Sequence, residues 1–433
     1  MGTRKIFRDD NFFNKPIDGD IVPLKFLCIE HSKYGANESA EEENLEDPRY
    51  IRITDITDDG ALRMDIYKSL SLDKSSNYLL KEGDLLFARS GATVGKTFLY
   101  KEVYGPAVYA GYLVKYRLNL KLCNPEYINY CTKSNQYKLW LKYTIIEATI
   151  ENISGEKYAN LSLPIPSLAQ QKKIVVYLDQ EVTKIDALIE KKTRLVELLE
   201  EKKKATISQA VNKGLNPNIK MKSSGIDWLG DIPEHWKLVR LKYLSDGLKY
   251  GANEAAEEDN PDFPRYIRIT DIDENGNLKP ETFKSISLEI ANEYLLEDGD
   301  ILFARSGATV GKTFRYTSNY GKSAYAGYLI RMRPNRKIDS QFMYYFTLSN
   351  SYWSQIYIDS IQATIQNFSG DKYANMLVTI PSNDEQIQIA KYLDNYIKQF
   401  SLLRDKVTNS IDLLKEKRTA IISSTINGEI NLN

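Results

Sequence analysis

Two stretches of the chain repeat apolar residues at steps of three and four, with lysine and glutamate between them. One runs from Gln170 to about Lys213, and the other from Glu385 to about Asn427. A sustained period of about 3.5 residues is typical of a coiled-coil seam. We therefore predict two long helices whose seams are formed by Leu178, Val182, Ile185 and Ile189 in the first and by Leu393, Ile397, Phe400, Val407, Ile411 and Leu414 in the second.

Each predicted helix has about 40 residues and would extend about 60 Å. Prolines stand ahead of both helices, and Gly214 and Gly428 follow them, as is usual at helix ends. A long helix with such a seam needs a partner, and the other predicted helix is the nearest one. We expect antiparallel pairing, which relates the two halves of the chain by a two-fold axis and holds two similar domains apart at opposite ends of a rod.

The segments ahead of the helices, residues 1–166 and 218–381, have a different pattern. Short β-branched and aromatic runs such as YIRITDI and DLLFAR lie between turn signals, including Asp-Asp-Gly at 58–60 and Glu-Asn-Gly at 274–276. This pattern is typical of strands joined by tight turns, with some helix. The sequence thus predicts an α+β protein with two strand-rich domains, each followed by a long helix.

The two halves of the chain are copies of one another. Tyr34-Gly-Ala-Asn37 and the segment 50–56 both recur 216 residues later. The run GDLLFARSGATVGKTF at 83–98 recurs at 299–314 with 15 of 16 positions identical, and Ala-Gly-Tyr112 returns as Ala-Gly-Tyr328. The Ala-Thr-Ile run at 148–150 returns 215 residues later, so one residue has been lost in between. A period of this size indicates a duplicated domain, because solenoid units have only about 20–50 residues.

Composition excludes several classes of protein. The 433 residues contain no apolar run of about 18, so a membrane-spanning helix is not expected, and no apolar segment near the start suggests a secretory signal. Three cysteines without a Cys-x-x-Cys pair and two histidines make a zinc site improbable and fit a reducing cytoplasm. Lys+Arg 58 balances Asp+Glu 58, which argues against a uniformly basic surface and leaves local basic patches open.

The duplicated run Gly91-Ala-Thr-Val-Gly95-Lys96-Thr97 is close to a phosphate-binding P-loop. However, the position of the first required glycine holds Ser90, or Ser306 in the second copy, and the residues that follow have a strand pattern. The alternatives are a structural turn and a glycine-rich hairpin whose cations contact a phosphate or a guanine edge. Nucleotide hydrolysis is the least favoured of these interpretations.

Two other repeated segments carry polar side chains. Polar and apolar residues alternate in Arg52-Ile-Thr54-Asp55, which predicts a strand that either has a plain surface face or directs Arg52 and Thr54 into a groove. Asn37 and Asn253 could pair with adenine through their side-chain amides. The acidic stretch at 41–47 is expected to point away from any nucleic acid. Neither histidine has a repeated partner, so we expect a binding protein without its own catalytic site.

The chain resembles the specificity subunit of a type I restriction-modification system over nearly its whole length. The resemblance rests on the half-chain repeats, the GDLLFARSGATVGKT and IRITDI runs, the segment Gly225-Ile-Asp-Trp228-Leu-Gly230-Asp-Ile-Pro233-Glu-His-Trp236, and the run Leu163-Pro-Ile-Pro166-Ser-Leu-Ala-Gln-Gln171 ahead of a long helix. It implies two target recognition domains, at 1–166 and 218–381, each reading half of a bipartite DNA site through the major groove. It also implies two conserved spacer helices, at 167–217 and 382–433.

The resemblance makes the repeated polar residues candidate DNA contacts. They are Tyr34, Asn37, Arg52, Thr54, Arg89, Ser90, Thr93, Lys96 and Tyr112 in the first half, and Tyr250, Asn253, Arg268, Thr270, Arg305, Ser306, Thr309, Lys312 and Tyr328 in the second. The seam residues of the helices are the candidates for pairing and partner docking.

Partners and cofactors are also implied by the resemblance. Besides double-stranded DNA, they are two modification (methyltransferase) subunits and the restriction (translocase and nuclease) subunits of a prokaryotic cytoplasm, with no membrane. S-adenosylmethionine, ATP and Mg²⁺ would bind to those partners, and catalysis would belong to them. An alternative is a DNA-reading subunit of a methylation-only or related phage-defence complex.

This chain departs from the family pattern in two ways. Residues 1–20 lack the tryptophan-containing segment that opens the second half, and only the VPLKFL run at 22–27 parallels the second copy. Recognition domains of one such subunit usually differ strongly, yet segments 34–56 and 250–272 match at 18 of 23 positions. We hypothesise that the two half-sites are nearly the same sequence in inverted orientation, with differences arising from diverged stretches such as 57–82 and 113–146.

Overall fold

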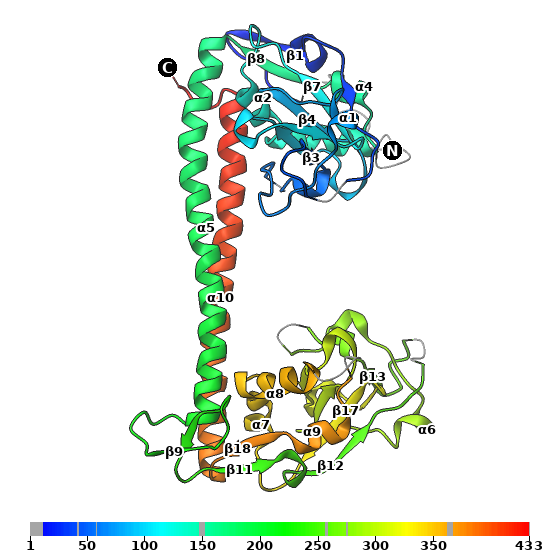
Figure 1. The fold of residues 1–433 in the computed structure, drawn as a ribbon, viewed down its shortest axis with the longest axis vertical. Helices are drawn as coiled ribbons and strands as arrows, with labels where there is room; N and C mark the ends of the chain where they lie inside the picture. The colour runs from blue at the N-terminus through cyan, green and yellow to red at the C-terminus, as the bar shows by residue number, and fades with distance from the viewer. Residues whose placement is uncertain are drawn as a thin grey trace. The chain divides into compact units, whose positions relative to one another are not determined.

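The computed structural model describes residues 12–40, 43–57, 59–146, 152–255, 259–273, 276–361 and 367–432. It forms two compact units, one made of Met1–Thr193 with Asn409–Asn433 and the other of Arg194–Thr408. Each unit therefore combines one strand-rich domain with part of the helix that follows it and part of the other long helix (Figure 1). The acidic residues at 41–42 and 257–258 and the repeated Ala-Thr-Ile runs lie outside the described residues.

Three small sheets organise the first unit. Strands β2, β7, β4 and β5 form an antiparallel sheet in that order, β3 pairs with β6 in parallel, and β1 pairs with β8 antiparallel. The strands are β1 (Gly19–Pro23), β2 (Lys33–Tyr34), β3 (Arg49–Ile51), β4 (Asp84–Ala88), β5 (Thr97–Leu99), β6 (Ala107–Tyr109), β7 (Leu113–Arg117) and β8 (Ser162–Pro166). The helices of its domain are α1 (Leu72–Ser75), α2 (Pro125–Cys131), α3 (Asn135–Ile146) and α4 (Gly155–Ala159).

The four-stranded sheet is covered on both faces, which explains the continuous apolar run of β4. Leu85 and Phe87 belong to a core shared with α2, α3 and α4. Leu86 and Ala88 point the other way, into a second core shared with β3 and β6. Because both faces are buried, β4 is apolar from Leu85 to Ala88, and its one charged residue, Asp84, is also buried.

The second unit repeats this arrangement. Its strands are β11 (Lys237–Arg240), β12 (Ser245–Tyr250), β13 (Arg265–Ile267), β14 (Ile301–Ala304), β15 (Thr313–Arg315), β16 (Ser323–Tyr325), β17 (Leu329–Pro334) and β18 (Leu377–Ile380). Its helices are α6 (Leu288–Ala291), α7 (Ser340–Thr347), α8 (Asn350–Ile361) and α9 (Gly370–Asn375). The sheet order β12-β17-β14-β15 and the pairs β13-β16 and β11-β18 match the first unit.

A hairpin of β9 (Met221–Ser223) and β10 (Asp231–Pro233) precedes the second domain. The tryptophan-containing segment noted in the sequence spans the turn and second strand of this hairpin and continues to Trp236. Trp236 is fully buried, and its indole Nε1 donates to Glu385 Oε2 at 3.1 Å. The segment thus anchors the start of the domain to the long helix that begins near Glu385.

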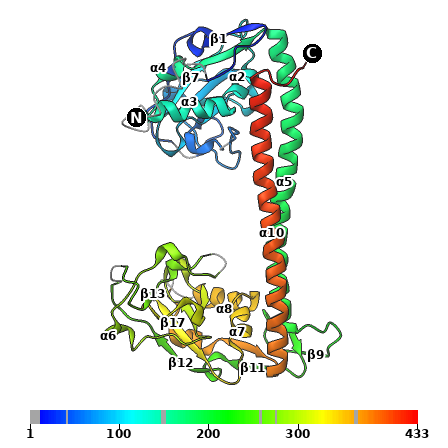
Figure 2. The same ribbon diagram turned by 180° about the vertical axis from the view of Figure 1, so that it is seen from behind.

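The long helices are α5 (Leu168–Lys213) and α10 (Asn383–Ile426), and they lie side by side in each unit (Figure 2). In the first unit, Arg418 Nε lies 3.0 Å from Asp186 Oδ1, while Leu178 and Val182 share a core with Ile422. Residues further along α5 therefore contact residues earlier in α10, as expected for antiparallel helices. In the second unit, Thr206 Oγ1 donates to Tyr396 Oη at 3.2 Å. The predicted antiparallel helix pair is confirmed.

Most predicted seam residues are buried between these helices or against the domains. Leu178, Val182, Ile185, Leu393, Phe400, Val407 and Ile411 are buried, and Ile189, Ile397 and Leu414 are half-buried. None of the helices among the described residues is long and apolar enough to cross a membrane.

Equivalent serines fasten each domain to the long helix that comes from the other half of the chain. Ser423 Oγ of α10 accepts a hydrogen bond from the backbone N–H of Asn135 at 2.8 Å, and Ser208 Oγ of α5 accepts from Asn350 at 2.8 Å. Both bonds close the first turn of a helix, α3 or α8, where backbone donors lack partners within the helix.

We expect Ser423→Ala to lower the free energy of unfolding by about 1–2 kcal/mol, because the Asn135 donor loses its partner. Urea denaturation measures the change. Ser424→Ala is the matched control, since the side chain of this half-buried neighbour has no hydrogen bond to the described residues. Equal losses for the two variants would contradict the anchoring role.

Candidate nucleic-acid interface

Strand directions bring most of the candidate residues of the first unit to one end of the four-stranded sheet. In the order β2-β7-β4-β5 each neighbour is antiparallel, so β2 and β4 end where β7 and β5 begin. Tyr34 ends β2, Arg89 follows β4, Tyr112 precedes β7 and Lys96 precedes β5. We call this end of the sheet, with the loops that extend it, the recognition edge.

Tyr34 and Arg89 form a pair at the centre of the recognition edge. The guanidinium carbon of Arg89 lies 4.9 Å from the Tyr34 ring centroid, and Tyr34 Oη accepts from the backbone N–H of Gly155 at 3.1 Å. The backbone of Arg89 is held by Tyr112 and Ile153. Within the described part of the chain, the buried Nε of Arg89 has no hydrogen-bond partner. A guanidinium held on the ring of a fixed tyrosine suits recognition of a base or phosphate.

The second unit has the same pair. Arg305 lies 4.9 Å from the Tyr250 ring centroid, and Tyr250 Oη accepts from Gly370 N–H at 2.9 Å. Nε of Arg305 likewise lacks a partner among the described residues. The repeated sequence therefore produces a repeated geometry.

Close contact between two backbones positions Asn37 beside Tyr112. A Cβ atom on Gly35 would lie 2.2 Å from the carbonyl oxygen of Tyr109, so this position admits no side chain. The close approach allows Gly111 N–H to donate to the Ala36 carbonyl at 2.7 Å. Asn37 is exposed and Tyr112 is 63% exposed, so both can reach a ligand at the recognition edge. Asn253 and Tyr328 are exposed in the same way in the second unit.

The strand predicted for Arg52-Ile-Thr54-Asp55 is wrong. Strand β3 ends at Ile51, and residues 53–55 form a 3-10 turn. The cause is the buried Asp55 carboxylate, which accepts from the Arg52 backbone N–H at 2.9 Å and from its guanidinium at 2.7 and 3.0 Å. Arg268 and Asp271 repeat this arrangement.

Arg52 thus forms an ion pair with Asp55 that stabilises the turn. Thr54 is exposed on this turn, as is Thr270 in the second unit. Ala110 N–H donates to the Ile51 carbonyl at 3.0 Å, which joins the start of the turn to the recognition edge.

The glycine-rich loop connects β4 to β5 as a hairpin, with a 3-10 turn at Gly91–Thr93. A P-loop opens a helix, whereas strand β5 follows directly here. Lys96 Nζ donates to the Ile56 carbonyl at 3.4 Å, and Lys312 Nζ to Ile272 at 3.0 Å, so each lysine ties the loop to the 3-10 turn after β3 or β13. Ser90, Thr93, Ser306 and Thr309 are half-buried along the two loops.

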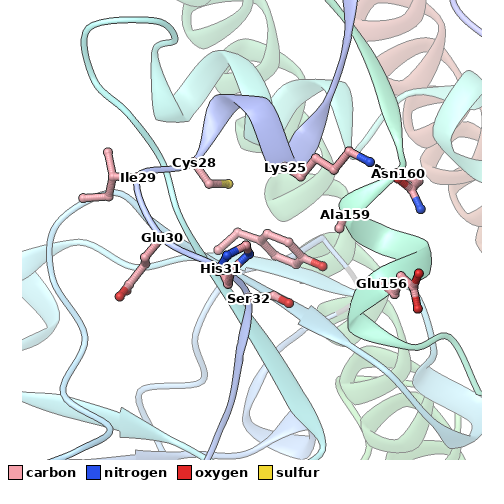
Figure 3. Close-up of a pocket in the computed structure, with 10 residues that line it drawn as sticks. Lys25, Cys28, Ile29, Glu30, His31, Ser32, Glu156, Ala159 and Asn160 are labelled. Atoms are coloured by element: carbon pink, nitrogen blue, oxygen red, sulfur yellow. Dashed lines mark hydrogen bonds between the residues drawn. The ribbon is translucent and has the colours of Figure 1, made fainter.

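A polar cavity of about 550 Å³ lies elsewhere in the first unit, between the segment after β1 and helix α4 (Figure 3). Lys25 Nζ donates to Asn160 Oδ1 at 2.8 Å across it. Burial raises the pKa of the Cys28 thiol to about 12, so it is not an activated nucleophile. A hydrogen bond from Lys33, together with Lys115 and Arg117, lowers the pKa of Glu30 to about 2, which keeps this carboxylate ionised and unsuited to general acid catalysis.

Sequence reasoning missed the apolar residues on the outer faces of the long helices. Leu195 and Leu198 of α5 are 42% and 45% exposed, and Leu402 and Leu413 of α10 are 57% and 64% exposed. The predicted seam residues are largely occupied within the protein, so these residues offer the apolar surface for a partner. Leucines outside the seam positions were the signal that could have identified them.

Comparison with known proteins decides the family. A family model described as the type I restriction modification DNA specificity domain matches residues 20–199 and again 233–413. The chain belongs to this family. Each match covers one strand-rich domain and much of the long helix that follows it, so both halves carry the specificity domain.

Relatives and solved structures agree with this assignment. The type I restriction enzyme MjaVIII specificity subunit of Methanocaldococcus jannaschii is 25% identical over 82% of this chain and 81% of its own length. The StySPI specificity subunit of Salmonella potsdam is 24% identical over 72% of this chain and 66% of its own length. A chain from a solved type I R-M system has a similar fold, with a TM-score of 0.73 at 15% identity, covering 96% of this chain and 100% of that one.

The specificity subunit is the DNA-recognition subunit of a type I restriction-modification system, and catalysis belongs to other subunits. This role agrees with the recognition edge, where cationic, amide and aromatic side chains gather around a pair of hairpin loops.

Proposed function

We propose that this specificity subunit reads an interrupted DNA target whose two half-sites are nearly the same sequence in inverted orientation. One observation supports this most directly, namely that the Tyr34–Arg89 pair and the Tyr250–Arg305 pair have the same 4.9 Å separation and equivalent backbone partners. Side chains in equal positions present the same donors to the major groove and therefore favour the same bases.

In this proposal the chain assembles with two modification subunits and with restriction subunits in a prokaryotic cytoplasm. The exposed Leu195 and Leu198 of α5, which share one helix face, support a docking role for the long helices, because contiguous exposed apolar surface is typical of interaction sites. S-adenosylmethionine, ATP and Mg²⁺ would be held by the partner subunits. A methylation-only complex differs only in its lack of restriction subunits, and a phage-plating assay separates the two.

Methylome sequencing of cells that carry the complete system, with and without this chain, tests the proposed target. The expected result is one methylated interrupted motif whose two half-sites match in inverted orientation. Two unrelated half-site sequences would refute the near-palindromic target, and motifs that persist without this chain would refute its role as the reader.

Lengthening both long helices should lengthen the spacer between the half-sites. Seven residues inserted after Thr193 in α5 and seven after Thr408 in α10 add about 10 Å of helix. This corresponds to about 3 base pairs of DNA at the usual rise. Methylome sequencing should show unchanged half-sites with a longer spacer, whereas insertion into α5 alone should destabilise the helix pair. An unchanged spacer in the double insertion would contradict the role of the helices as a ruler.

A further inference from the structure

A second cavity in the first unit joins the glycine-rich loop to helix α10. It has a volume of about 250 Å³, and its wall includes four cationic side chains, from Lys96, Lys133, Lys138 and Arg418, with one carboxylate, from Asp59. Lys96 comes from the recognition edge itself. Lys133 lies between α2 and α3, Lys138 lies in α3, and Arg418 lies in α10.

Internal contacts hold this cavity in place beside the recognition edge. Tyr137 Oη, from α3, donates to the Gly95 carbonyl of the glycine-rich loop at 2.9 Å. Thr97 and Thr132 share a buried hydroxyl–hydroxyl hydrogen bond of 2.8 Å. The loop, α3 and the lysine between α2 and α3 therefore form one packed assembly.

Arg418 and Lys133 differ in how their charges are compensated within the cavity. Arg418 lies 3.0 Å from Asp186 and 3.9 Å from Asp59, so its charge is compensated. No carboxylate among the described residues lies within ion-pair distance of Lys133 Nζ. Burial and the charges of Arg418 and Lys101 lower the pKa of Lys133 to about 8, although Asp59 and Asp186 oppose the shift. A lysine in this state gains from a bound anion, because the anion stabilises its protonated form.

The equivalent cavity of the second unit has a different chemistry. At the offset of 215 residues, Leu348 is equivalent to Lys133 and Trp353 is equivalent to Lys138. Lys203 of α5 is equivalent to Arg418 of α10. Leu348 and Trp353 lie in the wall of the second unit's cavity in place of the two lysines, Lys203 Nζ lies 3.6 Å from Glu200, and Lys204 and Lys312 are the other cations of this wall. This contrast is notable because the neighbouring glycine-rich loops are nearly identical.

We propose that the cavity of the first unit binds one backbone phosphate of the DNA beside the half-site read by that unit, and that the second unit makes no equivalent contact. This inference rests on the proposed function. A phosphodiester is the anion that a duplex at the recognition edge presents, and a cluster of lysines is a common phosphate-binding arrangement. Because only the first unit makes this phosphate contact, the two otherwise similar units bind DNA unequally. The contact therefore favours one orientation of the chain on a near-symmetric target.

Binding of this phosphate is linked to protonation of Lys133. The charged groups around Lys133 are Asp59, Asp186, Arg418, Lys101, Lys96 and Lys138, and burial lowers the pKa of Lys133 to about 8. A phosphate raises that pKa, so binding takes up protons between about pH 8 and the raised value. Affinity therefore falls as the pH rises through 8.

The test measures binding of a duplex containing the methylome-defined target to the full chain assembled with its modification subunits, as a function of salt and pH. Lys133→Leu introduces the residue found at the equivalent position of the second unit, Leu348. The variant is therefore expected to fold. We expect roughly 3- to 10-fold weaker binding at low salt and a salt slope reduced by about 0.9. The matched control is Lys121→Leu, an exposed lysine outside the cavity wall, which should change neither quantity.

Lys133→Arg supplies the second variant. It keeps a cation in the cavity, so the salt slope should stay near that of the wild-type chain while the fall in affinity above pH 8 disappears. An unchanged salt slope in Lys133→Leu would overturn the phosphate site and leave the proposed function intact. Failure of the wild-type assembly to prefer the target duplex over an unrelated duplex would overturn the proposed function itself.

Discussion

The Arg89→Ala/Arg305→Ala double variant should lose about 2–6 kcal/mol of binding free energy for the target duplex, because each base-reading arginine accounts for roughly 1–3 kcal/mol. The two arginines belong to separate units and share no partner, so their losses should add. The free chain already holds each guanidinium 4.9 Å from a tyrosine ring, so the arginines bind with little further ordering. Fluorescence anisotropy with the purified assembly measures the loss.

The single variants separate base reading from phosphate contact. Arg89→Ala should relax the sequence requirement in one half-site only, and Arg305→Ala in the other. Arg336→Ala removes an exposed arginine that follows β17, at the opposite end of this strand from Tyr328, and as the control it should bind normally. If either single variant instead weakens binding to all duplexes equally, the arginines contact phosphate and do not read bases.

Asp84→Ala should lower the free energy of unfolding of the first unit by about 1.5–3 kcal/mol, because Arg117 loses its two short hydrogen bonds to a buried carboxylate and keeps, among the described residues, only Glu30 as an ion-pair partner, at 3.5 Å. Asp84 is fully buried at the end of the sheet opposite the recognition edge. Its carboxylate accepts from Arg117 Nε at 2.8 Å and Nη2 at 2.7 Å, and Lys115 Nζ lies 4.0 Å away. Asp300 and Arg333 repeat the pair in the second unit at 2.9 Å for both bonds.

Hydrogen exchange under native conditions distinguishes the two units in this experiment. Asp84→Ala should reduce protection mainly in the first unit, and Asp300→Ala mainly in the second, since each pair lies within one unit. Asp65→Ala and Asp227→Ala remove exposed carboxylates and serve as controls, with changes within about 0.5 kcal/mol. A loss for Asp84→Ala no larger than that of Asp65→Ala would contradict the importance of the buried pair.

Periodic features of this chain could be predicted because they depend on neighbouring residues. The first helix, expected from Gln170 to about Lys213, is observed as Leu168–Lys213. Its partner is Asn383–Ile426, within a few residues of the expected limits. Apolar spacing and flanking glycines act through local hydrogen bonding and burial, so they carry their information in the sequence itself.

The turn after β3 shows where local pattern fails. Arg52-Ile-Thr54-Asp55 alternates like a strand, yet the Asp55 side chain captures the backbone and guanidinium of Arg52 and closes a 3-10 turn. A side-chain hydrogen bond of this kind competes with strand pairing and leaves no trace in the alternation. The role of Arg52 as a DNA contact remains a prediction, now with an internal ion pair that DNA would have to replace.

By itself, the sequence determined that this protein is an internally duplicated α+β chain with two long helices and the repeated loops of a specificity subunit. Only the tertiary structure decided that Tyr34, the loop from Arg89 to Lys96, and Tyr112 lie at one edge, because antiparallel strand order is set by pairing between separate segments of the chain. It also revealed that Lys133 and Arg418, separated by most of the chain, face one cavity. The physical reason is that charge compensation and burial depend on which side chains are in contact in the folded chain. The periodicity of the sequence does not specify those contacts.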